Sequence, residues 1–150
     1  MEDSDIENEQ ELRRPLGITL LGGLYLFFFM LTFSSYGQPI PFLGTIYHGK
    51  IAGVLVLFDS LICLYLFLGL MKRQSLTWYM LLIYNAFEMV NTTTNLLVIT
   101  SAELEKIVGE KVDTTGLYAS NISVILAILL LSAFIFHHRG YFTNHSKYLF

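Results

Sequence analysis

Four long apolar runs constrain the fold of this chain more than any other feature. They cover residues 16–36, 51–71, 76–99 and 117–136; the second and third each contain one acidic side chain, and the others contain no charge. Each run is near the roughly 20 residues that an α-helix needs to cross a hydrocarbon core of about 30 Å. Charged residues make up 14% of the chain, against about 25% in soluble domains. The runs therefore exclude a soluble globular domain.

Lipid offers no partner to exposed backbone groups, so a spanning segment is either a helix or a strand of a closed barrel. The four runs lack the alternation of a barrel strand. We therefore predict an all-α integral membrane protein, a four-transmembrane-helix up-down bundle over residues 15–136. An acidic, disordered cytoplasmic tail (1–14) precedes the bundle, and a basic and aromatic interfacial tail (137–150) follows it. The outer loop at 100–116 is expected to hold a short amphipathic surface helix beginning at Ser101.

Basic residues gather at one end of the predicted bundle. Six lie on the side of the termini and of the 72–75 turn, whereas three lie on the other side, two of them among acids. The positive-inside rule then places both termini in the cytoplasm and predicts a multi-pass protein of the cell membrane. The six are Arg13, Arg14, Lys72, Arg73, Arg139 and Lys147, and the three are Lys50, Lys106 and Lys111.

A polar stripe runs along the third span. Residues 85, 88, 92 and 95 are spaced three, four and three apart, which places them on one face of a helix. These positions hold Asn85, Glu88, Thr92 and Asn95, and Asn91 borders the same face. Such a stripe in an apolar helix is expected to face protein or water rather than lipid.

The two acids inside the runs are predicted to lie at the same depth. Asp59 precedes the end of the second run by 12 residues, and Glu88 follows the start of the third by 12. At 1.5 Å per residue, both lie about 18 Å from the short turn that joins the two helices. The four runs hold no Lys, Arg or His. We therefore expect a neutral pair, a pair that shares one proton, or a loosely held cation.

Polar side chains also gather at the outer ends of the spans, whereas leucine dominates the inner halves of the same spans. They suggest a polar cup that opens to the outside, with the two acids at its floor. The alternative is that the Asn, Ser and Thr side chains only hydrogen-bond helices to one another or to a partner's helix. The candidate residues of the cup are Ser34, Tyr36, Tyr118 and Asn121.

Several function classes are not indicated. The single cysteine, Cys63, excludes an internal disulfide, a Cys-x-x-Cys site and a thiolate metal cluster. The chain carries no phosphate-binding loop, dinucleotide fingerprint or nucleophile elbow, and no basic stripe for nucleic acid. His137 and His138 at the end of the last run are interpreted as interfacial side chains rather than metal ligands. We predict no catalytic residue, no metal and no cofactor.

Three short motifs carry a family resemblance. Arg-Pro-Leu-Gly-Ile-Thr opens the first span at 14–19, Gly-Leu-Met-Lys at 69–72 leads to Trp78, and Arg-Gly-Tyr-Phe at 139–142 begins the tail. In these the chain resembles small uncharacterised four-helix transmembrane proteins of archaea and bacteria that begin with an Arg-Pro-x-Gly-Ile/Val-Thr entry motif. The resemblance implies the topology and no activity. In helix number and buried acids the chain also resembles EXPERA-type proteins, which include sterol isomerases; no catalytic residue is transferred.

Three functions are compatible with these features. The first is a non-enzymatic accessory or structural subunit of a membrane complex, or a homo-oligomer, with the polar stripe as its contact surface. The second is a small membrane binding or transport protein whose Asp59 and Glu88 hold a proton, a cation, or an amine or lipid ligand. The third is a lipid-modifying enzyme that uses the same acids as proton donor and acceptor. The expected partners are the lipid bilayer and a membrane protein or second copy, with a small cationic or lipid ligand under the second function.

Overall fold

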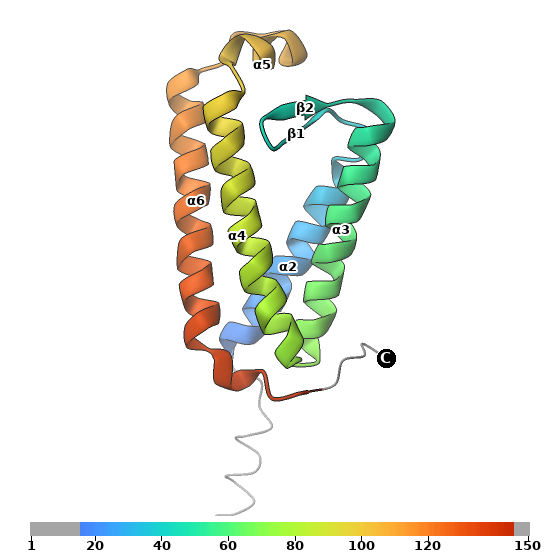
Figure 1. Cartoon of the computed structure of the whole chain (residues 1–150), viewed down its shortest axis with the longest axis vertical. Helices are drawn as coiled ribbons and strands as arrows, with labels where there is room; N and C mark the ends of the chain where they lie inside the picture. Colours follow the sequence, from blue (N-terminus) through green and yellow to red (C-terminus); the bar gives the residue numbers. More distant parts are fainter. Residues whose placement is uncertain (1–15, 146–150) are drawn as a thin grey trace, which may run out of the picture.

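The computed structural model describes residues 16–145. The predicted acidic tail and the last five residues of the predicted basic and aromatic tail lie outside this range. Four long helices form the body, with a β-hairpin and a short helix at one end and a short 3-10 turn at the other (Figure 1). The elements are α2 (Leu16–Ser34), β1 (Ile40–Phe42), β2 (Thr45–Tyr47), α3 (Gly49–Met71), α4 (Ser75–Val98), α5 (Ser101–Val108), α6 (Thr114–His137) and η1 (Arg139–Tyr141).

Three of the long helices in the described range, α2, α3 and α6, are long and apolar enough to cross a membrane. The fourth predicted span, α4, is equally long, with 24 residues. It does not reach the same apolarity, because its C-terminal half carries the polar stripe and the run Thr92-Thr93-Thr94. The helix boundaries agree with the predicted runs to within three residues.

The short surface helix predicted in the outer loop is confirmed as α5. Thr100 caps its N-terminus: the Thr100 hydroxyl accepts the Glu103 N–H, and the Glu103 carboxylate accepts the Thr100 N–H at 2.9 Å. This reciprocal capping box pairs two of the backbone donors that a helix start leaves free. Gly109, in the left-handed conformation, ends the helix.

A β-hairpin between α2 and α3 was not predicted. Helix α2 ends at Ser34, and after a turn the chain forms two three-residue strands with Phe42 opposite Thr45. The two turn residues, Leu43 and Gly44, have φ of 46° and 80°, which is the pattern of a type I′ turn. Leucine is unusual at this position, since φ > 0 favours Gly, Asn or Asp. The sequence therefore lacked the usual hairpin signal.

The long helices pack as two pairs, α2 with α3 and α4 with α6. The pairs meet at the α3–α4 turn and diverge toward the β-hairpin, which lies between them at the open end (Figure 1). Where α3 and α4 touch, a Cβ on Gly69 would overlap the Thr77 side chain, so only glycine permits this approach.

The fully buried side chains concentrate at the closed end, near the turn. The Trp78 indole donates to the Ile135 carbonyl at 2.9 Å, and the Arg139 guanidinium lies 4.9 Å from the centre of the Trp78 ring. The chain after α6 then crosses the turn: the Ser75 N–H donates to the Asn144 carbonyl at 2.8 Å. The core consists mainly of Ile18, Leu21, Tyr25, Leu66, Leu70, Leu81, Ile135 and Phe142. Packing is thus dense at the closed end and open toward the hairpin.

Candidate functional site

A cavity of about 470 Å³ lies between the two helix pairs. Small-molecule sites in proteins occupy about 300–1,000 Å³. Helices α2 and α6 supply most of its apolar wall, including Phe28, Ile128 and Leu131, while α3 and α4 supply most of its polar side chains. The polar residues that line it are Thr32, Asp59, Tyr84, Asn85, Glu88 and Thr92.

Asp59 and Glu88 come together at this cavity. Both line it, both also line a smaller cavity of about 280 Å³ beneath the β-hairpin, and they are close enough to interact electrostatically. Each side chain is half-buried. The matching depth predicted from the helical rise thus corresponds to a shared site in the structure. The described residues that line the two cavities include no Lys, Arg or His.

Asp59 is held by residues that the sequence analysis did not single out. The Tyr84 hydroxyl donates to Asp59 Oδ1 at 2.9 Å and also lies 3.3 Å from the Cys63 sulfur. Thr32 of α2 lines the same cavity as the Asp59 carboxyl. Tyr84 lies four residues before Glu88, on the same helix face, and this spacing would have identified it.

Asn85 connects three helices at the deep end of the cavity. Its side-chain oxygen accepts the Tyr25 hydroxyl of α2 at 2.7 Å, and its amide nitrogen donates to the Ser132 hydroxyl of α6 at 3.2 Å. Asn85 is buried, so these bonds replace those that water would make. The Asn85 amide therefore makes its hydrogen bonds within the bundle, to Tyr25 and Ser132.

Asn91 and Asn95 hold the β-hairpin. The Asn91 side-chain oxygen accepts the Leu43 N–H at 2.9 Å, and that of Asn95 accepts the Gly44 N–H at 2.7 Å. The two backbone donors of the tight turn are thus both paired with α4. Within the described part of the chain, Glu88 and Thr92 are the stripe residues that line the cavity without a hydrogen bond to another element.

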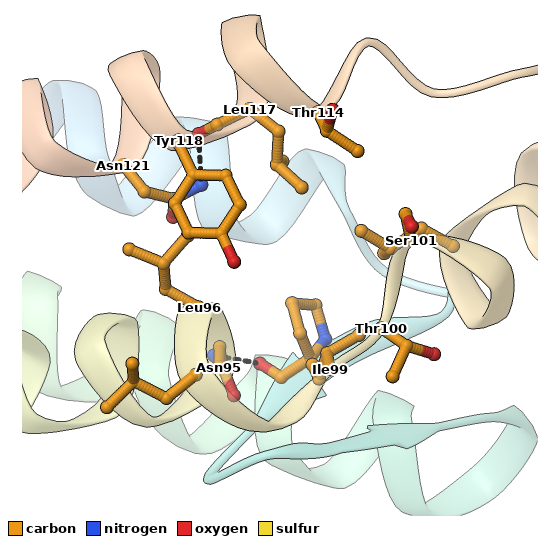
Figure 2. A pocket seen from close by; sticks show the side chains of 12 residues that line it. Asn95, Leu96, Ile99, Thr100, Ser101, Thr114, Leu117, Tyr118 and Asn121 are labelled. Carbon is orange, nitrogen blue, oxygen red and sulfur yellow. Dashed lines mark hydrogen bonds between the residues drawn. The ribbon is translucent and has the colours of Figure 1, made fainter.

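The outer-cup residues do not surround one cup. The Ser34 hydroxyl donates to the Leu31 carbonyl at 2.7 Å, and the exposed Tyr36 packs beside Gly53 at the start of α3. Tyr118 and Asn121 instead line a separate cavity of about 370 Å³ among α4, α5 and α6 (Figure 2). The structure therefore does not bring the four residues around one cavity, and the β-hairpin lies between the two helix pairs (Figure 1).

The predicted interfacial histidines take part in ring contacts. His138 stacks on Tyr141 at 5.6 Å and contacts the ring of Phe134 at 4.1 Å, and its Nδ1 lies 2.8 Å from the Phe134 carbonyl. His137 lies against His138 with the two rings nearly perpendicular.

Comparison of the chain with protein-family models, with curated proteins and with solved structures finds no match. The site itself indicates what it can do. It presents two carboxyls and the Thr92 hydroxyl at one side of a cavity whose opposite walls are apolar. Such an arrangement can bind a proton, a cation or a hydrogen-bond donor, and it can accommodate an apolar group beside it.

Proposed function

We propose that this protein is embedded in the cell membrane by four helices, with both termini in the cytoplasm. The outward face of α4 supports its inclusion. Ile83, Val90 and Leu97 are seven residues apart and are 69%, 57% and 76% exposed, so they form one apolar ridge along the helix. Several polar side chains of α4 are directed at other elements or at the cavity, which leaves this ridge for lipid.

Within this membrane protein, the proposed function is to bind a small ligand that carries a cationic group. The observation that carries the proposal is the pair Asp59 and Glu88 on the wall of an otherwise mainly apolar cavity. Carboxylates at membrane depth without a basic partner are costly as anions. A ligand cation would offset that cost, because it supplies the charge that the cavity lining lacks.

The test uses a short amine as the probe for the carboxyl pair. Saturation-transfer NMR on the full chain in lipid nanodiscs would detect even weak binding of ethylamine. We expect a saturable signal from the wild type and none from Asp59→Asn/Glu88→Gln, which keeps the shape of both side chains. Glu110→Gln, which removes an exposed acid after α5, serves as the matched control. Equal ethylamine binding by the wild type and the double variant would refute the proposal.

The accessory-subunit function stays a prediction. Its proposed contact surface is now α6 and no longer the polar stripe of α4. Asn85, Asn91 and Asn95 of the stripe already bind elements of this chain. Helix α6 is the least buried of the three apolar helices, and its Leu126 and Leu130 are exposed. If a partner helix exists, we propose that it packs on α6. Cysteine cross-linking between copies carrying Leu130→Cys would detect the homo-oligomeric form.

A further inference from the structure

The walls of the 470 Å³ cavity differ in chemistry from one side to the other. Asp59 of α3 and Glu88 of α4 lie on one side. Helices α2 and α6 contribute mainly apolar residues to the cavity, among them Phe28, Ala127 and Ile128, with Thr32 of α2 as the polar exception. A ligand that satisfies both sides has a cationic group next to an apolar body.

The cavity reaches the lipid-facing surface between α2 and α6. Near the closed end these helices touch, since Gly17 packs against the Phe134 ring. Farther along, both helices line the cavity, and two of the residues that line it there are exposed: Leu31 on α2 and Val124 on α6. In a membrane, this opening faces lipid chains at mid-depth rather than water.

The cavity is large enough to hold one alkyl chain. If a non-hydrogen atom takes about the 30 Å³ of a liquid water molecule, 470 Å³ holds on the order of 15 atoms. One alkyl chain with a small head group therefore fits inside the cavity.

We infer that the ligand is a single-chain aliphatic amine that enters from the bilayer between α2 and α6. Its ammonium group binds Asp59 and Glu88, and its chain lies along the apolar wall of α2 and α6. This inference rests on the proposed function and names its ligand class. Charge complementarity selects an amine over an alcohol, because an alcohol of the same length brings no cation to the two carboxyls.

The first test distinguishes the contribution of the ligand's amine head group from that of its alkyl chain. Full-length protein in phosphatidylcholine nanodiscs is titrated with decylamine and with decanol at equal mole fraction in the membrane. We expect saturable decylamine binding and about tenfold weaker decanol binding, equivalent to about 1.4 kcal/mol. Ala127→Phe, which fills the wall of the cavity, should weaken decylamine binding by about tenfold. Ala133→Phe, an exposed position on α6 that does not line this cavity, is the matched control.

A second measurement does not depend on a variant. Decylamine carrying a photoreactive diazirine at the end of its chain is irradiated in wild-type nanodiscs, and the labelled peptides are identified by mass spectrometry. Labels on the cavity wall, at residues such as Phe28 and Ile128, are expected, and excess decylamine should suppress them. Labels confined to the β-hairpin or to α5 would overturn the inference.

The outcomes distinguish the inference from the function on which it rests. If ethylamine binds through the acids but Ala127→Phe leaves decylamine binding intact, the chain site is wrong and the cation site stands. If Asp59→Asn/Glu88→Gln binds both amines like the wild type, the proposed function is wrong and the inference fails with it.

Discussion

At the scale of single residues, the polar stripe of α4 divides into three different tasks. Asn85 joins helices, Asn91 and Asn95 hold a hairpin, and Glu88 and Thr92 face a cavity. Spacing along a helix predicts which residues share a face. It does not predict their partners, because those come from elements that are distant in the sequence.

Asn85→Leu is expected to lower the free energy of unfolding by about 1–3 kcal/mol, since it leaves the buried Tyr25 hydroxyl without its acceptor. Reversible unfolding in mixed micelles would measure this loss. Asn121→Leu is the control variant, because the Asn121 amide in the described structure donates to the Leu117 carbonyl of its own helix and joins no other element. An Asn85→Leu protein as stable as the wild type would mean that the Tyr25–Asn85–Ser132 connection contributes nothing.

The pKa of Glu103 provides a pH prediction outside the membrane-spanning helices. The Thr100 N–H, then the Thr100 hydroxyl, and to a smaller extent Lys106 stabilise the charged carboxylate and lower the pKa of Glu103. A lowered folded pKa stabilises α5 at pH above the ordinary glutamate value of about 4.3. This stabilisation is lost as the pH falls through the folded value.

Amide hydrogen exchange on α5 would measure that loss. We expect protection of the first turn to decrease as the pH falls through the acidic range in the wild type, after correction for intrinsic exchange rates. Glu103→Gln keeps an acceptor for the Thr100 N–H but carries no charge, so its protection should be nearly independent of pH. A wild-type profile as flat as that of Glu103→Gln would contradict the assignment.

At the scale of elements, the sequence predicted the four long helices and α5 well, because apolar run length and amphipathic spacing are local properties. The matching depth of Asp59 and Glu88 could also be predicted from the sequence, since the rise per residue of a helix is constant. The β-hairpin was not, because its strands have three residues each and its turn is Leu-Gly. Its stability depends on Asn91 and Asn95, 48 and 51 residues away from the turn residues that they bind.

The hairpin should therefore detach when those two amides are removed. In Asn91→Leu/Asn95→Leu, the Leu43 and Gly44 N–H groups lose their acceptors, and we expect their exchange to accelerate toward that of an open loop. Exchange within α3 should change little, because none of the bonds removed involves α3. Thr93→Leu, an exposed position on the same helix, serves as the control. Unchanged protection of the turn in the double variant would show that the strands alone hold the hairpin.

At the scale of the whole molecule, the dense end and the open end have different roles. The turn end is cross-linked within the α4–α6 pair by Trp78 to Ile135 and by Ser75 to Asn144, and the two pairs meet there where Gly69 of α3 packs against Thr77 of α4. The other end diverges and leaves the cavity between them. A rigid base beneath an open cavity is suited to binding a ligand without collapse of the walls.

Whether α4 crosses the membrane decides the orientation of everything after it, and the two arrangements give opposite labelling patterns. We replace Cys63 by Ser and introduce one cysteine at Lys111, between α5 and α6, or at Gly140, after α6. If all four helices span, intact cells exposed to a membrane-impermeant maleimide label Lys111→Cys and not Gly140→Cys. If only α2, α3 and α6 span, with the N-terminus still inside, Lys111→Cys lies inside and Gly140→Cys outside, so the pattern reverses. Labelling of both sites after permeabilisation is the control for reactivity. We expect the four-span pattern, because the basic residues Lys72 and Arg73 lie in the α3–α4 turn and Arg139 directly follows α6, at the end that the positive-inside rule assigns to the cytoplasm.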